Sequence, residues 1–155
     1  TSEGAAAYCK QRTPFLCHRA PARMGHVELL RFKLEALHRV LEAYAERTLL
    51  LDGYANFRRP ECLQALLQHD ADIVVKIGGA PECPHSKYRT LGVSINTGLV
   101  LVKPAAIPML HEMLTFDVSG WEQHCSCWEH HCYEQELFNK YVAARWSWVE
   151  FPVRM

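Results

Sequence analysis

The sequence predicts a single α/β domain with a partly parallel sheet. Stretches whose apolar residues follow a helical spacing alternate with short, strongly apolar stretches that are typical of buried strands. The 155 residues are enough for a hydrophobic core, and the balance of 49% hydrophobic to 22% charged residues is ordinary for a globular protein. No internal repeat or low-complexity linker divides the chain, so we expect one domain.

The clearest unit is a helix followed at once by a strand. Between Leu30 and Tyr44, apolar residues recur at alternating steps of four and three, which predicts an amphipathic helix over residues 26–46. Thr48 and the three leucines at residues 49–51 then predict a buried strand, and Asp52 follows it directly. In open α/β sheets ligands bind beyond the carboxyl ends of strands, so Asp52 is the first candidate for a site. A turn aspartate is the simpler alternative.

The later elements continue the alternation. Pro60 is typical of the first turn of a helix, and residues 93–103 predict a strand whose two apolar halves are separated by a polar step at residues 96–98. Such a step indicates either backbone that approaches a ligand or a β-bulge. The other expected elements are a strand at residues 71–76, helices at residues 104–116 and 134–142, and a last strand at residues 146–151.

Charge and cysteine content narrow the classes of function. The 17 basic and 17 acidic residues give zero net charge, which argues against binding nucleic acid through bulk charge. No stretch approaches the ~18 apolar residues of a membrane span. Seven cysteines fit either a secretory-pathway protein with one or two disulfides or a cytosolic protein with free thiols. We expect the first.

Three motifs in this order resemble the nucleotide-diphospho-sugar transferases with a GT-A fold. Residues 50–54 (LLDGY) resemble the strand end "lDxD" of that family, residues 95–104 (INTGLVLVKP) its "NxG" strand, and residues 133–139 (YEQELFN) its "DQ…N" helix. The resemblance covers roughly residues 8–154. It implies a GT-A-like, Rossmann-like fold with a mixed, mostly parallel sheet flanked by helices.

The resemblance implies a glycosyltransferase that moves a sugar from a nucleotide-diphosphate donor to a glycan or protein acceptor. Its cofactor would be Mn²⁺ or Mg²⁺, because a divalent cation neutralises the departing diphosphate. The implied compartment is the Golgi lumen of the secretory pathway, with membrane association only through a segment absent from this sequence. The residues that match the family's functional positions are, for donor binding, Lys33, Asp52, Asn96 and Gly98, for the metal, Asp52, and for catalysis, Glu134 and Gln135.

The sequence departs from the family at the metal motif. Tyr54 stands where the family has its second aspartate, which leaves Asp52 as a single carboxylate. The missing aspartate leaves two further hypotheses. The domain is a degenerate, non-catalytic binding module, or cations of the protein bind the diphosphate without metal. Nothing before Tyr8 resembles the family's nucleotide-gripping strand and loop, so we expect residues 1–155 to form a domain truncated at both ends. The cations in question are Arg58, Arg59, Lys76 and Lys103.

A second cluster favours different chemistry. Residues 124–132 (HCSCWEHHC) hold six potential zinc ligands in nine residues, which leaves a small zinc-binding protein as a further alternative. The cysteines are closer together than in the usual pairs of zinc knuckles. A disulfide from this loop to a distant cysteine is the preferred prediction.

Overall fold

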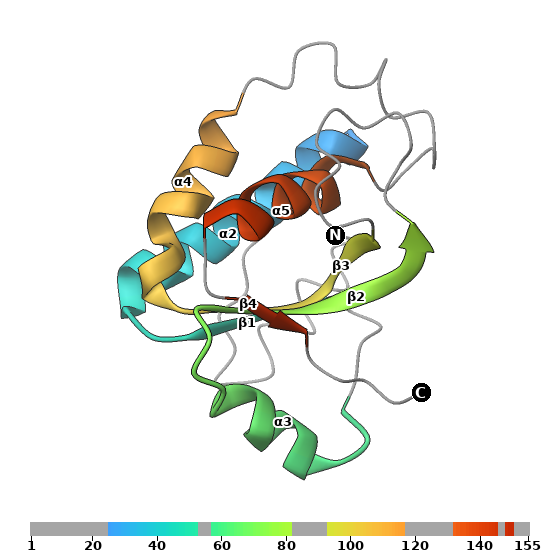
Figure 1. The fold of residues 1–155 in the computed structure, drawn as a ribbon. Helices are drawn as coiled ribbons and strands as arrows, with labels where there is room; N and C mark the ends of the chain where they lie inside the picture. The colour runs from blue at the N-terminus through green and yellow to red at the C-terminus, as the bar shows by residue number, and fades with distance from the viewer. Residues whose placement is uncertain (1–24, 53–56, 82–92, 117–131, 146–147, 151–155) are drawn as a thin grey trace, which may run out of the picture.

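A sheet of four strands lies between two unequal layers of helices (Figure 1). The computed structural model describes residues 25–52, 57–81, 93–116, 132–145 and 148–150. Helices α2, α4 and α5 cover one face of the sheet, and α3 covers the other. The strands are β1 (Thr48–Leu51), β2 (Ile73–Pro81), β3 (Val93–Val102) and β4 (Trp148–Glu150); the helices are α2 (His26–Tyr44), α3 (Pro60–Leu67), α4 (Ile107–Thr115) and α5 (Cys132–Arg145), with a 3-10 turn, η1 (Pro104–Ala106), before α4.

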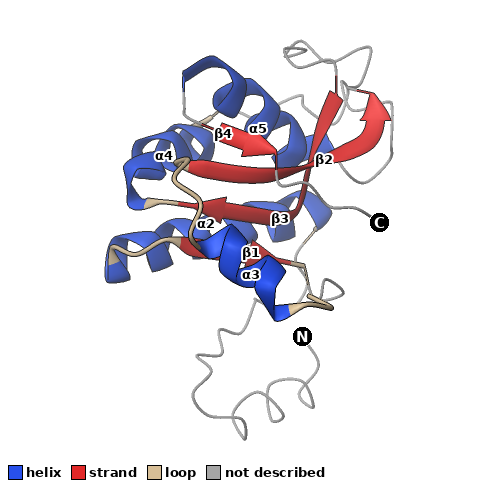
Figure 2. Cartoon of the chain, turned by 60° about the horizontal axis from the view of Figure 1, so that its bottom comes forward, coloured by secondary structure: helices blue, strands red, loops and turns tan. Residues whose placement is uncertain are grey.

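The strand order corrects the predicted fold class. The strands lie in the order β1-β3-β2-β4, which Figure 2 shows across the sheet. The central strand β3 is antiparallel to both neighbours, whereas β2 and β4 are parallel. The predicted mostly parallel, GT-A-like sheet is therefore wrong. β1 and β2 run in the same direction, as expected for a strand–helix–strand unit. They are not neighbours, however, because β3 lies between them and runs in the opposite direction.

The main core lies between the sheet and the three-helix layer. The apolar stripe of α2 supplies Leu34, Leu37 and Leu41, which are all buried, and α5 supplies the fully buried Phe138. A smaller cluster on the other face packs Leu66 of α3 against the sheet. Because burial of one large apolar side chain contributes about 1.5–3 kcal/mol, most of the stabilisation comes from the three-helix side. That side also fixes the position of α2 relative to β1.

The first turn of α2 carries a local test of stability. The backbone N–H of Gly25 donates to Oε2 of Glu28 at 2.8 Å, at an exposed position. Replacing Glu28 with alanine removes this acceptor and should lower the free energy of unfolding by about 0.5–1 kcal/mol, measured by urea denaturation. Glu28→Gln keeps an oxygen acceptor and should lose less. An equal loss in both variants would instead assign the effect to the negative charge at the helix N-terminus.

Candidate functional site

Three segments that are distant in sequence meet at the carboxyl end of β1. Asp52 follows the last residue of β1, and its backbone N–H donates to the Gly98 carbonyl at 3.1 Å. Lys33 of α2 reaches the same point: its Nζ donates to Oδ1 of Asp52 at 2.7 Å and to the Thr97 carbonyl at 3.2 Å. We call Lys33, Asp52 and residues 96–98 the junction site. Three of the four predicted donor-binding residues therefore meet here. Asp52 contacts both Lys33 and Gly98, and Lys33 contacts Thr97, the neighbour of Gly98.

The ion pair of the junction site is partly buried. The side chain of Lys33 is 19% exposed and that of Asp52 is 25% exposed. Lys33 precedes the buried Leu34 in α2, so its aliphatic stem lies beside the apolar stripe while its ammonium group reaches the sheet. A pair in this setting is less screened by solvent than a surface pair, which typically contributes about 0–1 kcal/mol. Lys33 and Asp52 therefore join α2 to the sheet.

An irregularity in β3 supplies the backbone part of the junction site. Val75 of β2 pairs with Val100, but the next residue, Lys76, pairs with Asn96. The residues between these two pairs on β3 have no register partner on β2, as in a β-bulge. Oδ1 of Asn96 accepts a hydrogen bond from the Gly98 N–H at 2.9 Å, which holds the bulged segment. The polar step predicted at residues 96–98 is thus a bulge, and its Thr97 carbonyl binds the ammonium group of Lys33.

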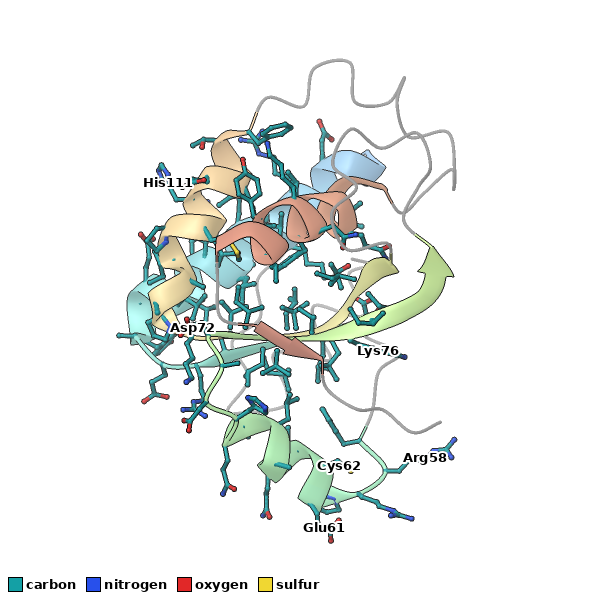
Figure 3. All side chains as sticks on the ribbon, viewed as in Figure 1. Arg58, Glu61, Cys62, Asp72, Lys76 and His111 are labelled. Carbon is teal, nitrogen blue, oxygen red and sulfur yellow. The ribbon has the colours of Figure 1, made fainter. Side chains whose placement is uncertain are left out.

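The side chain of Asn96 lies on the other face of the sheet from Asp52. Ile95 and Ile77, which pair across the strands, pack into the core under the three helices. Since side chains alternate along a strand, Asn96 and its partner Lys76 occupy the α3 face. Figure 3 shows Lys76 on the α3 side of the strands. Asn96 thus contributes to the junction site through the bulge that it holds.

Helix α5 contacts β3 through Asn139, a residue that the sequence motifs do not connect with any function. Oδ1 of Asn139, which is 4% exposed, accepts a hydrogen bond from the Ile95 N–H at 2.9 Å. Its signal in the sequence is a polar residue directly after the apolar pair Leu137 and Phe138. Of the two predicted catalytic residues, Gln135 is half-buried in α5, and Glu134 belongs to the same helix, although its side chain lies outside the described residues.

The other predicted cations are distributed widely. Lys103 donates to the Asp70 carbonyl, and its own N–H donates to the Asp72 carbonyl at 2.8 Å. These contacts place it beyond the end of β3 that is remote from Asn96. Arg58 and Arg59 are exposed just before α3, and Figure 3 shows Arg58 extending into solvent. Only Lys76, among these four described cations, pairs with a residue of the junction site.

Most of the residues on which the alternative hypotheses depend lie outside the part of the chain that the structure describes. Residues 124–131 of the zinc-ligand cluster and Tyr54 lie outside them, and so does the side chain of Cys132. Within the described ranges, no three His, Cys, Asp or Glu side chains are grouped so that they could hold a metal ion. Cys62 is exposed and has a free thiol. No helix in the part of the chain that the structure describes is both long and apolar enough to cross a membrane.

Comparison with known proteins adds no family to these observations. No protein-family model, curated protein or solved structure matches the chain. The resemblance to nucleotide-diphospho-sugar transferases therefore stays a prediction. Function is inferred from the junction site and from the residues that surround it.

Proposed function

We propose that this domain binds a nucleotide-diphospho-sugar and serves a glycosyltransferase reaction, in which the sugar moves to a glycan or protein acceptor. The observation that supports this function is the contact of Lys33 with both Asp52 and the bulge of β3. The resemblance assigns donor binding to these same three segments, and they come together although they are far apart in the chain.

The chemistry of the junction site suits a diphosphate. A nucleotide-sugar donor carries negative charge that grows on the leaving group as the glycosidic bond breaks, and fixed cations stabilise this charge. The Lys33 ammonium group provides such a cation, and its side chain is partly exposed to solvent. A glycine within a strand, here Gly98 in the bulge, can mark a place where a ligand approaches the main chain. We therefore assign the diphosphate of the donor to the junction site.

Helix α5 is the proposed source of the catalytic groups. Asn139 joins α5 to Ile95, the residue before Asn96, at a buried hydrogen bond. Gln135 and Glu134 precede Asn139 by little more than one helical turn, roughly 6–8 Å along the axis at 1.5 Å per residue. Within this proposal, Glu134 acts near the reacting sugar as acid or base and Gln135 positions the donor or the acceptor.

A non-catalytic binding module is the second candidate function. The observation that favours it is the ion pair itself: the Asp52 carboxylate, to which the resemblance assigns a metal, already accepts a hydrogen bond from an ammonium group. A module of this kind would bind a nucleotide sugar without transferring it. Both functions share the donor site and differ only in turnover.

Isothermal titration calorimetry of the full chain tests the shared donor site. We expect UDP-glucose, UDP-N-acetylglucosamine or GDP-mannose to bind with a Kd of about 0.01–1 mM, which corresponds to about −7 to −4 kcal/mol. Lys33→Met should weaken this binding by about tenfold or more. Arg39→Met is the matched control, because it removes the same charge from the same helix at a side chain that is 75% exposed.

The outcome of the titration separates the functions. Binding followed by release of the nucleoside diphosphate, detected by chromatography, supports the enzyme. Binding without any turnover supports the module. If none of these three nucleotide sugars binds at about 5 mM, the proposed donor site is wrong, because such an affinity would be too weak for a specific ligand.

A further inference from the structure

We infer that the junction site works without a divalent cation, and that the Lys33 ammonium group takes the place that Mn²⁺ or Mg²⁺ holds in the resembled family. The part of this inference that concerns donor binding rests on the proposed function. The part that concerns metal does not, because it follows from the contacts of Asp52. Both parts can be measured separately.

The geometry of the ion pair disagrees with a metal at Asp52. Nζ of Lys33 lies 2.7 Å from Oδ1 of Asp52. Mg²⁺ binds carboxylate oxygens at about 2.0–2.1 Å, so a cation at Oδ1 would lie within about 5 Å of the ammonium nitrogen. Like charges at this separation repel each other strongly at a partly buried site. A metal at Oδ1 would therefore have to compete with Lys33 for that oxygen.

The donor set points the same way. Mg²⁺ requires near-octahedral oxygen coordination and is usually held by one or two carboxylates together with the phosphates of its ligand. Asp52 supplies one carboxylate, and Tyr54 occupies the sequence position of the second. In the ranges that the structure describes, no three metal-binding side chains gather anywhere. The residues present do not fit the metal that the resemblance implies.

The contacts of Lys33 fit the role of a fixed cation. Its ammonium group is oriented by two oxygens, the Asp52 carboxylate and the Thr97 carbonyl, and its stem leaves a helix packed on the main core. An ammonium group held in this way is a preorganised point charge, which is the kind of group that stabilises a diphosphate. The ligand class is therefore the diphosphate of a nucleoside diphosphate or of its sugar ester, bound in the presence of a chelator.

Binding of Mn²⁺ alone tests the metal part directly. The full chain and its Asp52→Asn variant are titrated with MnCl₂, and free Mn²⁺ is measured by its electron paramagnetic resonance signal. We expect the two proteins to bind Mn²⁺ with the same affinity, within about twofold, since a lone carboxylate paired with lysine adds little to metal binding. Binding at least tenfold tighter in the wild type than in Asp52→Asn would overturn the inference.

A measurement on the wild type alone guards against a variant that does not fold. UDP-glucose, UDP-N-acetylglucosamine and GDP-mannose are titrated by calorimetry in EDTA and again in MnCl₂. Equal affinity in the two buffers supports the inference, whereas binding that requires Mn²⁺ overturns it. If no nucleotide sugar binds in either buffer, the proposed function fails, and the comparison of Mn²⁺ binding still decides whether Asp52 is a metal ligand.

Discussion

Replacing Asn139 with leucine is expected to lower the free energy of unfolding by about 2–3 kcal/mol. Oδ1 of Asn139 is the acceptor for the N–H of Ile95, and both residues are buried. Leucine has the same branching and the same number of side-chain heavy atoms as asparagine, so it leaves no cavity but removes the acceptor. A buried N–H without an acceptor costs about 1–3 kcal/mol.

The matched control for this change is Gln135→Leu on the same helix. It makes the same chemical change, amide to leucine, at a half-buried position, and should alter stability by no more than about 0.5 kcal/mol. Urea denaturation monitored by circular dichroism compares the variants. Amide hydrogen exchange gives a second readout, since the Ile95 N–H should exchange faster in Asn139→Leu than in the wild type. An Asn139→Leu variant as stable as the control would contradict the contribution assigned to this hydrogen bond.

Replacing Lys33 with methionine is expected to destabilise the protein by about 2 kcal/mol. Methionine keeps the apolar stem but removes the donor to the Asp52 carboxylate and to the Thr97 carbonyl. Exposed ion pairs contribute about 0–1 kcal/mol, and breaking a fully buried pair costs about 3–5 kcal/mol. The Lys33–Asp52 pair, at 19% and 25% exposure, lies between these limits.

A double-mutant cycle isolates the energy of the pair. Asp52→Asn, Lys33→Met and the double variant should give a coupling energy of about 1–2 kcal/mol in urea denaturation. Arg39→Met is the control, because the Arg39–Glu35 pair on the outer side of α2 has an N–O distance of 3.8 Å and a largely exposed arginine. This control should change stability by less than about 0.5 kcal/mol. Zero coupling between Lys33 and Asp52 would show that the pair does not hold α2 to the sheet.

The elements of the fold could be predicted because each has its own periodicity. The leucine stripe that predicts a helix over residues 26–46 matches α2, and the apolar run 48–51 matches β1. The strand expected at residues 71–76 extends further, to Pro81, because β2 pairs with β3 beyond its apolar segment. Apolar spacing reports which side chains are buried, and it does not report where a paired strand continues through glycine, alanine and proline, as at residues 78–81.

The pairing of the strands could not be predicted from the same pattern. Periodicity shows that residues 93–103 form a strand, but it contains no information on the neighbours of that strand or on its direction. The alternation of helices and strands favoured a partly parallel sheet, and the resemblance implied a mostly parallel one. The insertion of β3 between β1 and β2 contradicts the mostly parallel sheet. The partners in a sheet are chosen by the packing of the whole chain.

The candidate site was predicted in part. Lys33, Asp52, Asn96 and Gly98 were identified from motifs, and the structure adds how they meet, through an ion pair and a bulge. The Thr97 carbonyl could not be foreseen, because a backbone acceptor has no signature in the sequence. The roles assigned to Glu134 and Gln135 stay predictions.

The strand order has a consequence for how the chain reaches this structure. β1 forms its described pairing only when Val102 comes into register with Thr48. β4 joins the sheet only when Trp148 comes into register with Ile73. Each of these pairings closes a long loop, and loop closure costs chain entropy before any hydrogen bond between the strands forms. Helices such as α2 and α4 need only neighbouring residues. In the contact-order view, the sheet is therefore the slow step of folding, and the junction site exists only after that step.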